Sequence, residues 1–463
     1  MVELTPTQIM DIDTTADYSF LYDGLSKQSI DFHQALAELV DNAISAKRGD
    51  YFTIEILLEA KEEQIQVTVA DDGKGISKDE LQTTVLRLGG RGASPGLLNE
   101  HGFGLKNSLC LLTGNKRPFA IITADHETAA LGLQWAVDGP FRPSMQARLA
   151  ADGRWLKDLV LCKGSTGTRV SAMTTHDYFR TLYPRAKNLD ILATRLAEHL
   201  GVFYRHWLSA DPRNQIWLRW KHGSSAWRDI VVPAVKLPIK DDQQSFSIDV
   251  ELDGIKAHGK YTIGAIDESK TQGDHPPFPL EIYYQHTERT QGVDVVVRNK
   301  VILTHQLEQL WLGQIRRRER NDFLGELVLE GGNFSTVNNK TDLDPHNPLW
   351  LAVKEQLNSR TELLPPKYSA GRDEVAIRDG LKDLLEQFET GSKAWVNYPV
   401  WSGTGVRADI IHEGPNSSWL DVYEIKDAPA APQDVYQLIM YWDGLVNDGK
   451  TPRRGRLVAE SAP

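Results

Sequence analysis

The segment L-A-E-L-V-D-N-A-I-S (residues 36–45) would display two opposite stripes if it formed an α-helix. At about 100° per residue, the apolar stripe consists of Leu36, Leu39, Val40 and Ala43. The opposite, polar stripe consists of Glu38, Asp41, Asn42 and Ser45. A solvated helix face would by itself explain the polar stripe. The segments that follow along the chain favour a functional explanation.

The composition of the 463-residue chain is typical of a soluble globular protein, with 41% hydrophobic and 25% charged residues. This length exceeds what one core usually holds, so we expect two to four domains. The sequence has no apolar run of about 18 residues, and its start M-V-E-L-T-P-T does not follow the order of a signal peptide. We therefore expect no membrane span and a cytoplasmic location. Two cysteines, Cys110 and Cys162, are too few for a disulfide framework or a cysteine-rich zinc site.

The net charge of −11 argues against a protein whose whole surface binds nucleic acid. Two arginine clusters depart from this balance, G-Q-I-R-R-R-E-R-N at 313–321 and T-P-R-R-G-R at 451–456. Each cluster could contact phosphate groups or could be an ordinary solvated surface.

Helix and strand patterns in residues 1–190 predict an α+β fold. A helix at about 28–47 precedes a β-hairpin at 51–73, in which apolar residues alternate on both sides of E-A-K-E-E-Q. A glycine-rich region at 89–104 leads into a helix from about 105, and strands are expected at 119–125, 131–139 and 168–175. Helices on one face of such a sheet would form an α/β sandwich.

Two further blocks follow in the sequence. The second block, 191–357, has a predicted helix at 191–208 and predicted strands at 246–254, 259–266 and 293–302. The polar segment 358–373 contains a Pro-Pro pair and is predicted to be a linker. The third block, 374–463, is a small α/β unit with predicted helices at 374–388 and 432–446 and predicted strands at 395–401, 407–413, 420–426 and 455–460.

Three glycine-rich turns lie behind the first helix. V-A-D-D-G-K-G-I (69–76) ends a strand at Asp71 and leaves room for a flat ligand at Gly73 and Gly75. G-G-R-G-A-S-P-G-L-L-N-E-H-G-F-G-L-K-N-S (89–108) opens a helix whose free N–H groups suit phosphates. G-S-T-G-T-R-V (164–170) places Thr168 at the start of a strand. Taken singly, each could be a hairpin or capping turn. The sequence contains no P-loop pattern.

The order E-x-x-x-N on a helix, D-x-G-x-G, a lid, G-x-G-x-K on a helix and G-T resembles the GHKL ATPases, which include gyrase B, MutL, histidine kinases and MORC proteins. This resemblance implies binding of ATP with Mg²⁺. It makes Glu38 the general base for the attacking water, and Asn42, one turn further on, a ligand of Mg²⁺. Asp71 would accept a hydrogen bond from the adenine amino group, with Gly73 and Gly75 beside the ring.

The same resemblance assigns the rest of the nucleotide site. Residues 76–101 would be a mobile lid, and Asp41 would be a supporting or solvated residue. The positions around the phosphates and the Asp71 network would be Gly102, Gly104, Lys106 and Thr168. Asn99 stands where the family often has glycine, which puts the contacts of that lid turn in doubt, although asparagine tolerates left-handed backbone.

The second block resembles the S5-like α/β transducer domain of the gyrase, MutL and MORC branch. In S-T-V-N-N-K-T-D-L-D-P (335–345), Lys340 matches the lysine that reaches the γ-phosphate, and an ordinary surface lysine is the alternative. We find no dimerisation helix with a phosphoacceptor histidine ahead of the site, which argues against a histidine kinase. The resemblance implies an ATP-dependent homodimer formed through the GHKL domain.

The third block places three chemically active residues on neighbouring predicted strands. Asp409 lies on one strand, and Glu424 and Lys426 lie two residues apart on the next, where they share a face. Two carboxylates bind a hard cation such as Mg²⁺, and a lysine can orient or activate water. A salt-bridged pair of strands is the alternative.

This arrangement resembles the PD-(D/E)xK nucleases, whose core is a restriction-endonuclease-like α/β fold. Glu374 opens the preceding helix, where that fold often supplies another acidic metal ligand. Gln437 and Tyr441 form Q-x-x-x-Y on the following helix, as in the RecB-like branch.

The two resemblances together predict an ATP hydrolase and metal-dependent endonuclease. We expect an ATP-gated, Mg²⁺-dependent nuclease that acts on double-stranded DNA in defence against phage or foreign DNA, with a further defence-system subunit as a candidate partner. The alternative is a MORC-like DNA clamp, remodelling or repair protein whose nuclease-like block only binds. A chaperone-like ATPase is a third class, which the last block disfavours.

Overall fold

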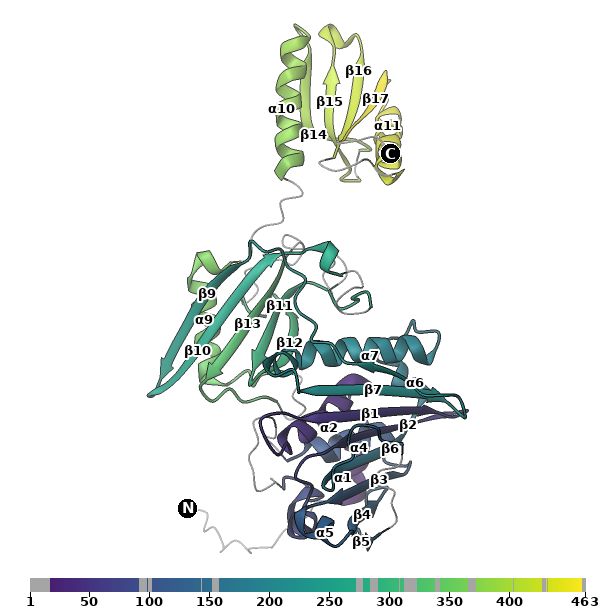
Figure 1. Cartoon of the computed structure of the whole chain (residues 1–463). Coiled ribbons are helices and arrows are strands. Elements are labelled where there is room, and N and C mark those ends of the chain that lie inside the picture. The colour runs from purple at the N-terminus through teal and green to yellow at the C-terminus, as the bar shows by residue number, and fades with distance from the viewer. Residues whose placement is uncertain are drawn as a thin grey trace, which may run out of the picture. The chain divides into compact units, whose positions relative to one another are not determined.

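The segment 36–45 lies inside helix α2 (Phe32–Ser45) of the computed structural model. The structure describes residues 17–90, 98, 102–142, 144–151, 158–271, 278–283, 290–307, 309–311, 323–337, 342–364, 372–402, 404–426, 430 and 432–459. The chain divides into two units, residues 1–365 and 366–463, and each is described by itself (Figure 1). This division falls inside the segment 358–373 that the sequence predicts as a linker.

An eight-stranded sheet with the order β5-β4-β3-β6-β2-β1-β7-β8 organises the first part of unit 1. Its strands are β1 (Thr53–Ala60), β2 (Gln64–Asp71), β3 (Phe119–Ala124), β4 (Gln134–Asp138), β5 (Ala147–Ala150), β6 (Gly167–Thr175), β7 (Gln215–His222) and β8 (Arg228–Val231). The predicted hairpin at 51–73 is confirmed, because β1 and β2 pair antiparallel. Strand β7 pairs parallel to β1. The sheet therefore continues beyond residue 190, where the sequence predicts the end of the first domain.

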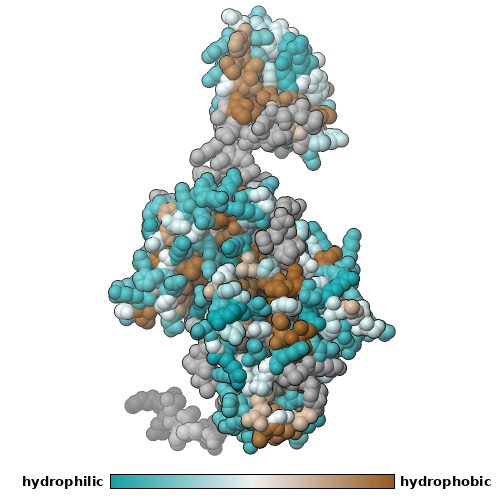
Figure 2. Space-filling view, viewed as in Figure 1, coloured by the Kyte–Doolittle hydropathy of each residue, from teal (hydrophilic) through white to brown (hydrophobic). Residues whose placement is uncertain are grey.

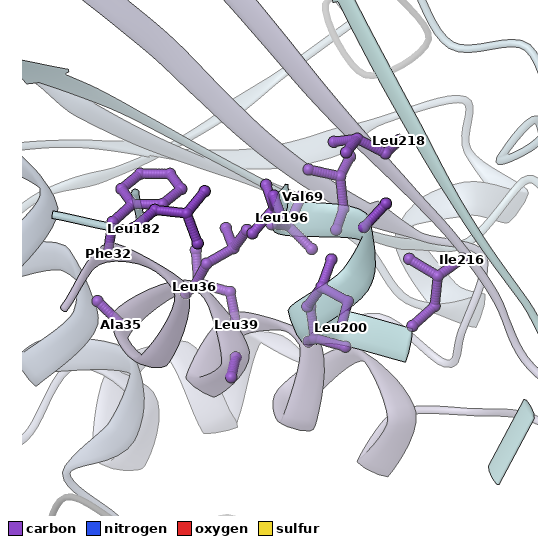
Figure 3. Packing of buried hydrophobic residues seen from close by; sticks show 14 of the residues in the cluster. Phe32, Ala35, Leu36, Leu39, Val69, Leu182, Leu196, Leu200, Ile216 and Leu218 are labelled. Atoms are coloured by element: carbon purple, nitrogen blue, oxygen red, sulfur yellow. The ribbon is translucent and has the colours of Figure 1, made fainter. Parts of the chain in front are cut away.

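Helices α2 and α7 pack on this sheet and build its core. The helical segments of this part are α1 (Tyr18–Leu25), α2, α3 (Lys78–Glu80), a π-helix (Leu81–Val85), α4 (Gly104–Thr113), α5 (His126–Ala130), α6 (His176–Arg180), α7 (Leu189–Phe203) and α8 (Arg205–Ala210). Figure 3 shows Leu36 of α2, Leu196 of α7 and Leu218 of β7 packed in one cluster. The predicted apolar stripe of α2 is confirmed, since all four of its side chains are buried.

The helix predicted at 191–208 is two helices, α7 and α8. Tyr204 interrupts it with φ −110° and ψ 14°, outside the helical range. The Tyr204 hydroxyl instead donates a hydrogen bond toward α2, 2.8 Å from the carbonyl oxygen of Ala37. The helix is therefore interrupted at a residue that contacts α2, and the spacing of apolar residues along the sequence cannot predict such a tertiary contact.

A second, five-stranded sheet completes unit 1, in the order β12-β11-β13-β10-β9. Its elements are β9 (Gln244–Leu252), β10 (Ile255–Ala265), a 3₁₀ turn (Glu268–Thr271), β11 (Gly292–Val297), β12 (Lys300–Gln306), β13 (Phe323–Gly331), α9 (Pro348–Ser359) and a 3₁₀ turn (Thr361–Leu363). The single strand predicted at 293–302 is wrong, because this stretch is a hairpin of β11 and β12. Arg298 and Asn299 form its turn with φ of 53° and 62°. Asparagine tolerates this left-handed backbone, so Asn299 is the local sequence signal for the turn.

Unit 2 contains a helix, three strands, a helix and a final strand. These are α10 (Arg372–Phe388), β14 (Lys393–Pro399), β15 (Arg407–Glu413), a 3₁₀ turn (Pro415–Ser417), β16 (Leu420–Ile425), α11 (Pro432–Asn447) and β17 (Arg454–Val458). The sheet order is β14-β15-β16-β17, and α11 joins the parallel pair β16 and β17. The helices and strands predicted for the third block are confirmed. Figure 2 shows hydrophobic residues gathered beside α10, on which Ile377, Leu384 and Phe388 are exposed.

Candidate functional site

A cleft in unit 1 lies between α2, the end of β2, the start of β6 and the N-terminus of α4. The predicted nucleotide-site residues that line it are Asn42, Asp71, Gly75, Gly102, Gly104, Lys106 and Thr168. Apolar side chains line the rest, among them Leu39, Val69, Ile76, Val85, Leu105 and Val170. The cleft thus combines an apolar wall with a few polar groups, as small-molecule sites do.

Asp71 is a buried acidic group in the lining of this cleft. Its Oδ1 accepts hydrogen bonds from the backbone N–H groups of Gly73 at 2.9 Å and Thr168 at 3.3 Å. Burial raises the pKa of Asp71 to about 7, against the opposing effect of these two hydrogen bonds. A carboxyl group so placed can accept a hydrogen bond from a ligand amine, which would relieve the cost of its buried charge.

Thr123 belongs to the same hydrogen-bond network, and sequence reasoning missed it. Its Oγ1 lies 3.2 Å from Thr168 Oγ1 and accepts a hydrogen bond of 2.8 Å from the backbone N–H of Ile76. The β-sheet register places Thr123 opposite Thr168, which in turn lies opposite Asp71. This relation depends on strand pairing between distant segments, and no motif in the sequence signals it.

Glu38 and Gly104 meet where α2 approaches the start of α4. A Cβ atom on Gly104 would lie only 2.1 Å from Glu38 Oε2, so a larger residue would have to displace this carboxylate. Glu38 itself is 5% exposed, which rules out a fully solvated polar stripe on α2. On the other side of the cleft, a Cβ on Gly75 would lie 2.0 Å from the carbonyl oxygen of Ala124. Gly75 is therefore required for the close approach of two backbone segments, whereas Gly104 leaves room for the Glu38 carboxylate in its present position.

Asn42, one turn beyond Glu38, supplies an amide to the cleft. Its Nδ2 is buried and has no hydrogen-bond partner among the described residues. Since the oxygen and nitrogen of an amide are assigned from their partners, either end of this group can face a ligand. A carboxylate and an unpartnered amide on one helix face fit a nucleotide with Mg²⁺, for which Asn42 would provide an oxygen ligand.

The N-terminus of α4 faces the same space. No described side chain caps its first turn at Phe103, so the free N–H groups and the positive end of the helix dipole remain for an anion. Lys106, in this first turn, donates a hydrogen bond of 3.1 Å to the carbonyl oxygen of Val85 in the π-helix. Burial lowers the pKa of Lys106 to about 8. A phosphate group would restore the charged form by pairing with it.

Asp41 is fully buried, so the prediction that it might be solvated is wrong. Its carboxylate accepts hydrogen bonds from Tyr204 and from Lys300, a residue of the second sheet that sequence reasoning did not single out. The supporting role that the sequence offered as the alternative agrees with this burial.

Several predicted positions lie outside the described residues. These are residues 91–97 and 99–101 of the predicted lid 76–101, with Asn99 among them, the arginine cluster 313–321 and Lys340. The second arginine cluster, 451–456, lies within the described residues. Its Arg453 pairs with the buried Asp421 at 2.9 and 2.8 Å and stacks over Trp419, so its charge is already matched within the fold.

Unit 2 brings together five of the residues predicted for its site: Asp409, Glu424, Lys426, Gln437 and Tyr441. Lys426 Nζ lies 2.5 Å from Glu424 Oε1. Asp409 Oδ2 accepts a hydrogen bond of 2.8 Å from the backbone N–H of Ile425. Gln437 Nε2 donates to the Tyr441 hydroxyl at 2.6 Å. Glu374 lies in α10, but its side chain is outside what the structure describes.

The charge state of the Glu424 carboxyl group depends on its burial and on these neighbouring side chains. Burial raises the pKa of Glu424 to about 7, helped by Asp409 and opposed by Lys426. Burial, together with the carboxyl groups of Glu424 and Asp409, raises the pKa of the Tyr441 hydroxyl to about 12. Two close acidic groups, the buried Glu424 and the half-buried Asp409, favour a divalent cation, which would offset their repulsion. Among the described residues, no group of three or more His, Cys, Asp and Glu side chains could hold a metal ion, and the side chain of Glu374 is not one of those described.

The fold and the cleft of unit 1 define a GHKL-type ATPase domain. Residues 30–138 match the family described as "Histidine kinase-, DNA gyrase B-, and HSP90-like ATPase". Such ATPases bind ATP, usually with Mg²⁺, and their domains commonly dimerise. No curated protein matches the chain. None of the described helices is long and apolar enough to cross a membrane.

The raised pKa of Asp71 leads to a prediction about pH. A raised folded-state pKa means that the contribution of Asp71 to stability is fully present below its ordinary value of 3.8 and is lost as the pH rises through about 7. Asp71→Asn cannot ionise. At pH 8 we expect it to raise the unfolding temperature of the nucleotide-free protein by a few degrees, with little difference near pH 4, and to weaken ATP binding about tenfold or more. Calorimetry and titration with a fluorescent ATP analogue measure both effects. Weaker thermal stability at pH 8 together with unchanged binding would contradict this assignment.

The close approach of Gly104 and Glu38 leads to a second prediction. Gly104→Ala must displace the Glu38 carboxylate, so we expect kcat for ATP hydrolysis to fall about ten- to a hundredfold. Gly49→Ala is the matched control, because a Cβ at Gly49 meets nothing within 4 Å. A phosphate-release assay on both variants measures this effect. Equal rates of ATP hydrolysis in the two variants would show that Glu38 is not held in position by its contact with Gly104.

Proposed function

We propose that this protein is an ATP-gated, Mg²⁺-dependent DNA nuclease. The observation that carries the proposal is the cluster of Asp409, Glu424 and Lys426 with the Gln437–Tyr441 pair, in a chain that also has a GHKL-type ATPase domain. The order of helices and strands in unit 2 supports it, because the central strands carry the acidic residues and the following helix carries Q-x-x-x-Y.

In the ATPase domain, Glu38 would polarise the attacking water and Asn42 would hold Mg²⁺ through its amide oxygen. Asp71 would select adenine, and Lys106 and the N-terminus of α4 would bind the phosphates. The Mg²⁺ ion would neutralise part of the negative charge of the phosphates. The buried carboxylate of Glu38 against Gly104 and the unpartnered amide of Asn42 support these roles.

In unit 2, Asp409 and Glu424 would hold Mg²⁺ and Lys426 would orient the attacking water. The metal would supply a Lewis acid for the phosphodiester. Glu424 has a pKa of about 7, so at neutral pH it is partly protonated until a cation favours its charged form. Lys426 already lies at hydrogen-bond distance from Glu424, which keeps its ammonium group beside the carboxyl group.

Gating would connect the two activities. ATP would close two GHKL domains into a homodimer, and Lys340 would contact the γ-phosphate, so the second sheet would act as the transducer. The ATPase site and the nuclease-like cluster lie in separate units, so a conformational or dimerisation signal has to link them. Defence against foreign DNA, with a further subunit as partner, is an analogy from the pairing of these two domain types.

The second candidate function is a MORC-like DNA clamp or remodelling protein whose unit 2 only binds. The contact of Lys426 with Glu424 favours it, because Lys426 Nζ lies 2.5 Å from Glu424 Oε1 and can balance this buried carboxyl group without a metal ion. Metal-dependent cleavage, rather than binding of DNA, separates the two functions.

The nuclease proposal is tested by Glu424→Gln. We expect this variant to lose Mg²⁺-dependent cleavage of plasmid DNA and to keep ATPase rates near those of the unchanged protein. Glu413→Gln, on neighbouring β15, is the control and should cut normally. The raised pKa of Glu424 favours its uncharged form below about pH 7, and Mg²⁺ binds the charged form. The Mg²⁺ concentration for half-maximal cutting should therefore fall as the pH rises from about 6 to 8. Equal cutting by both variants would favour the clamp.

The gating proposal is tested by cleavage with no nucleotide, with ATP and with a non-hydrolysable analogue. Glu38→Ala should bind ATP without releasing phosphate, so with ATP it should cut at the rate that the unchanged protein shows with the analogue. Both rates should differ at least about fivefold from the nucleotide-free rate, whichever the direction. Identical cutting in all three conditions would leave a nuclease that ATP does not control.

A further inference from the structure

The turn between β11 and β12 reaches from the second sheet to the helix that carries Glu38 and Asn42. Lys300, the first residue of β12, places its Nζ 2.9 Å from Oδ1 and 2.7 Å from Oδ2 of Asp41 on α2. Lys300 is 4% exposed and Asp41 is 0% exposed. The two residues are 259 positions apart in sequence, so this buried ion pair joins two distant segments of unit 1.

The Asp41 carboxylate is also held from a third element. The Tyr204 hydroxyl donates to Asp41 Oδ1 at 2.7 Å, and Lys300 Nζ lies 5.5 Å from the centre of the Tyr204 ring. Tyr204 is the residue at which α7 ends, so α2, α7 and the hairpin meet at one carboxylate. Removing one partner of a buried ion pair leaves an uncompensated charge and is strongly destabilising. These three elements are thus expected to move together.

Asp41 occupies a sensitive position on α2. It follows Glu38 by three residues and directly precedes Asn42. A rotation or shift of the helix at Asp41 therefore moves both groups that are proposed to act on the γ-phosphate. Misplacement by about 1 Å at such groups can cost a hundredfold in rate.

The hairpin is tied into the second sheet, although its pairing has register shifts between Val293 and Val295 and between Val295 and Val296. Its turn is tight, because Val297 and Lys300 pair directly around Arg298 and Asn299. Strand β11 is buried along its whole length between β12 and β13. A second buried contact fixes the same sheet to α8, where Arg205 pairs with Asp294 of β11 at 3.0 Å and with Glu326 of β13.

From these contacts we propose that Lys300 is a positioning residue for ATP hydrolysis, which makes the placement of Glu38 and Asn42 depend on the position of the second sheet. The inference rests on the proposed roles of Glu38 and Asn42. It extends them by naming the contact through which the second sheet and the nucleotide cleft influence each other. Such coupling is reciprocal, so nucleotide binding must also affect the hairpin.

Three variants test the pair: Lys300→Met, Asp41→Asn and the double variant. Lys300→Met removes the ammonium group that pairs with the buried Asp41 carboxylate, so we expect a lower unfolding temperature in the nucleotide-free protein. We expect kcat to fall about ten- to a hundredfold with KM for ATP within about twofold, because adenine recognition by Asp71 is untouched. The double variant removes both charges, so its stability should recover most of the loss while kcat stays low.

Hydrogen exchange gives a readout that does not depend on turnover. In the unchanged protein, a non-hydrolysable ATP analogue should change the protection of residues 292–306 as well as that of α2. In Lys300→Met the response of 292–306 should disappear while α2 still responds. Arg219→Met is the matched control, because Arg219 pairs at 2.8 Å with the buried Glu55 on β1 and does not line the cleft. It should lower stability but keep kcat and the exchange response.

The outcomes separate this inference from the proposed function. Unchanged kcat in Lys300→Met, or a double variant that regains kcat together with stability, would overturn the positioning role and leave a purely structural ion pair. Phosphate release that persists in Glu38→Gln would instead overturn the assignment of the general base, whatever Lys300 does.

Discussion

Burial of a polar helix face is the constraint on which unit 1 depends. Helix α2 packs its apolar stripe into the sheet core, while its opposite stripe is covered by α4, Tyr204 and the tip of the β11–β12 hairpin. Buried polar groups are normally hydrogen-bonded, and the groups of this stripe differ in whether the fold supplies their partners. Asp41 takes a lysine and a tyrosine, Glu38 lies against a glycine at the start of α4, and Asn42 keeps an open amide toward the cleft. Support and ligand binding are thus divided among neighbouring residues of one helix.

The two candidate sites share a physical property. Asp71 in unit 1 and Glu424 in unit 2 are both buried carboxyl groups whose pKa is raised to about 7. Each is thermodynamically costly in its charged form without a ligand, and each becomes favourable when a hydrogen-bond donor or a cation arrives. Such positions reduce the stability of the empty fold and strengthen binding, which is a common relation between active sites and stability. Arg453 and Asp421 show the contrasting case, in which the protein supplies the counter-charge itself.

Much of the fold could be predicted from local patterns, and the failures have physical causes. The alternation around E-A-K-E-E-Q predicted β1 and β2 because one turn joins two adjacent strands. The stretch 293–302 was predicted as one strand since its apolar run hides a two-residue turn, whose signal is a single asparagine. The helix 191–208 was predicted as continuous because helical periodicity persists through Tyr204, although that residue is drawn into a contact with α2. In the candidate nucleotide site, sequence analysis singled out the residues that lie in compact motifs. It missed Thr123 and Lys300, because only strand pairing and the position of the β11–β12 hairpin place them near the other residues.

The sequence by itself determined the types of chemical group and their local spacing: an acid and an amide one helical turn apart, glycines where backbone must approach closely, and two carboxyl groups with a lysine on adjacent strands. These follow from helix and strand periodicity, which acts over a few residues. The tertiary structure alone decided which groups are buried, which carboxyl groups are already paired and which remain for a ligand. Those properties depend on distant segments such as residues 41 and 300, because desolvation and ion pairing are set by what packs against a side chain and not by its neighbours in the chain.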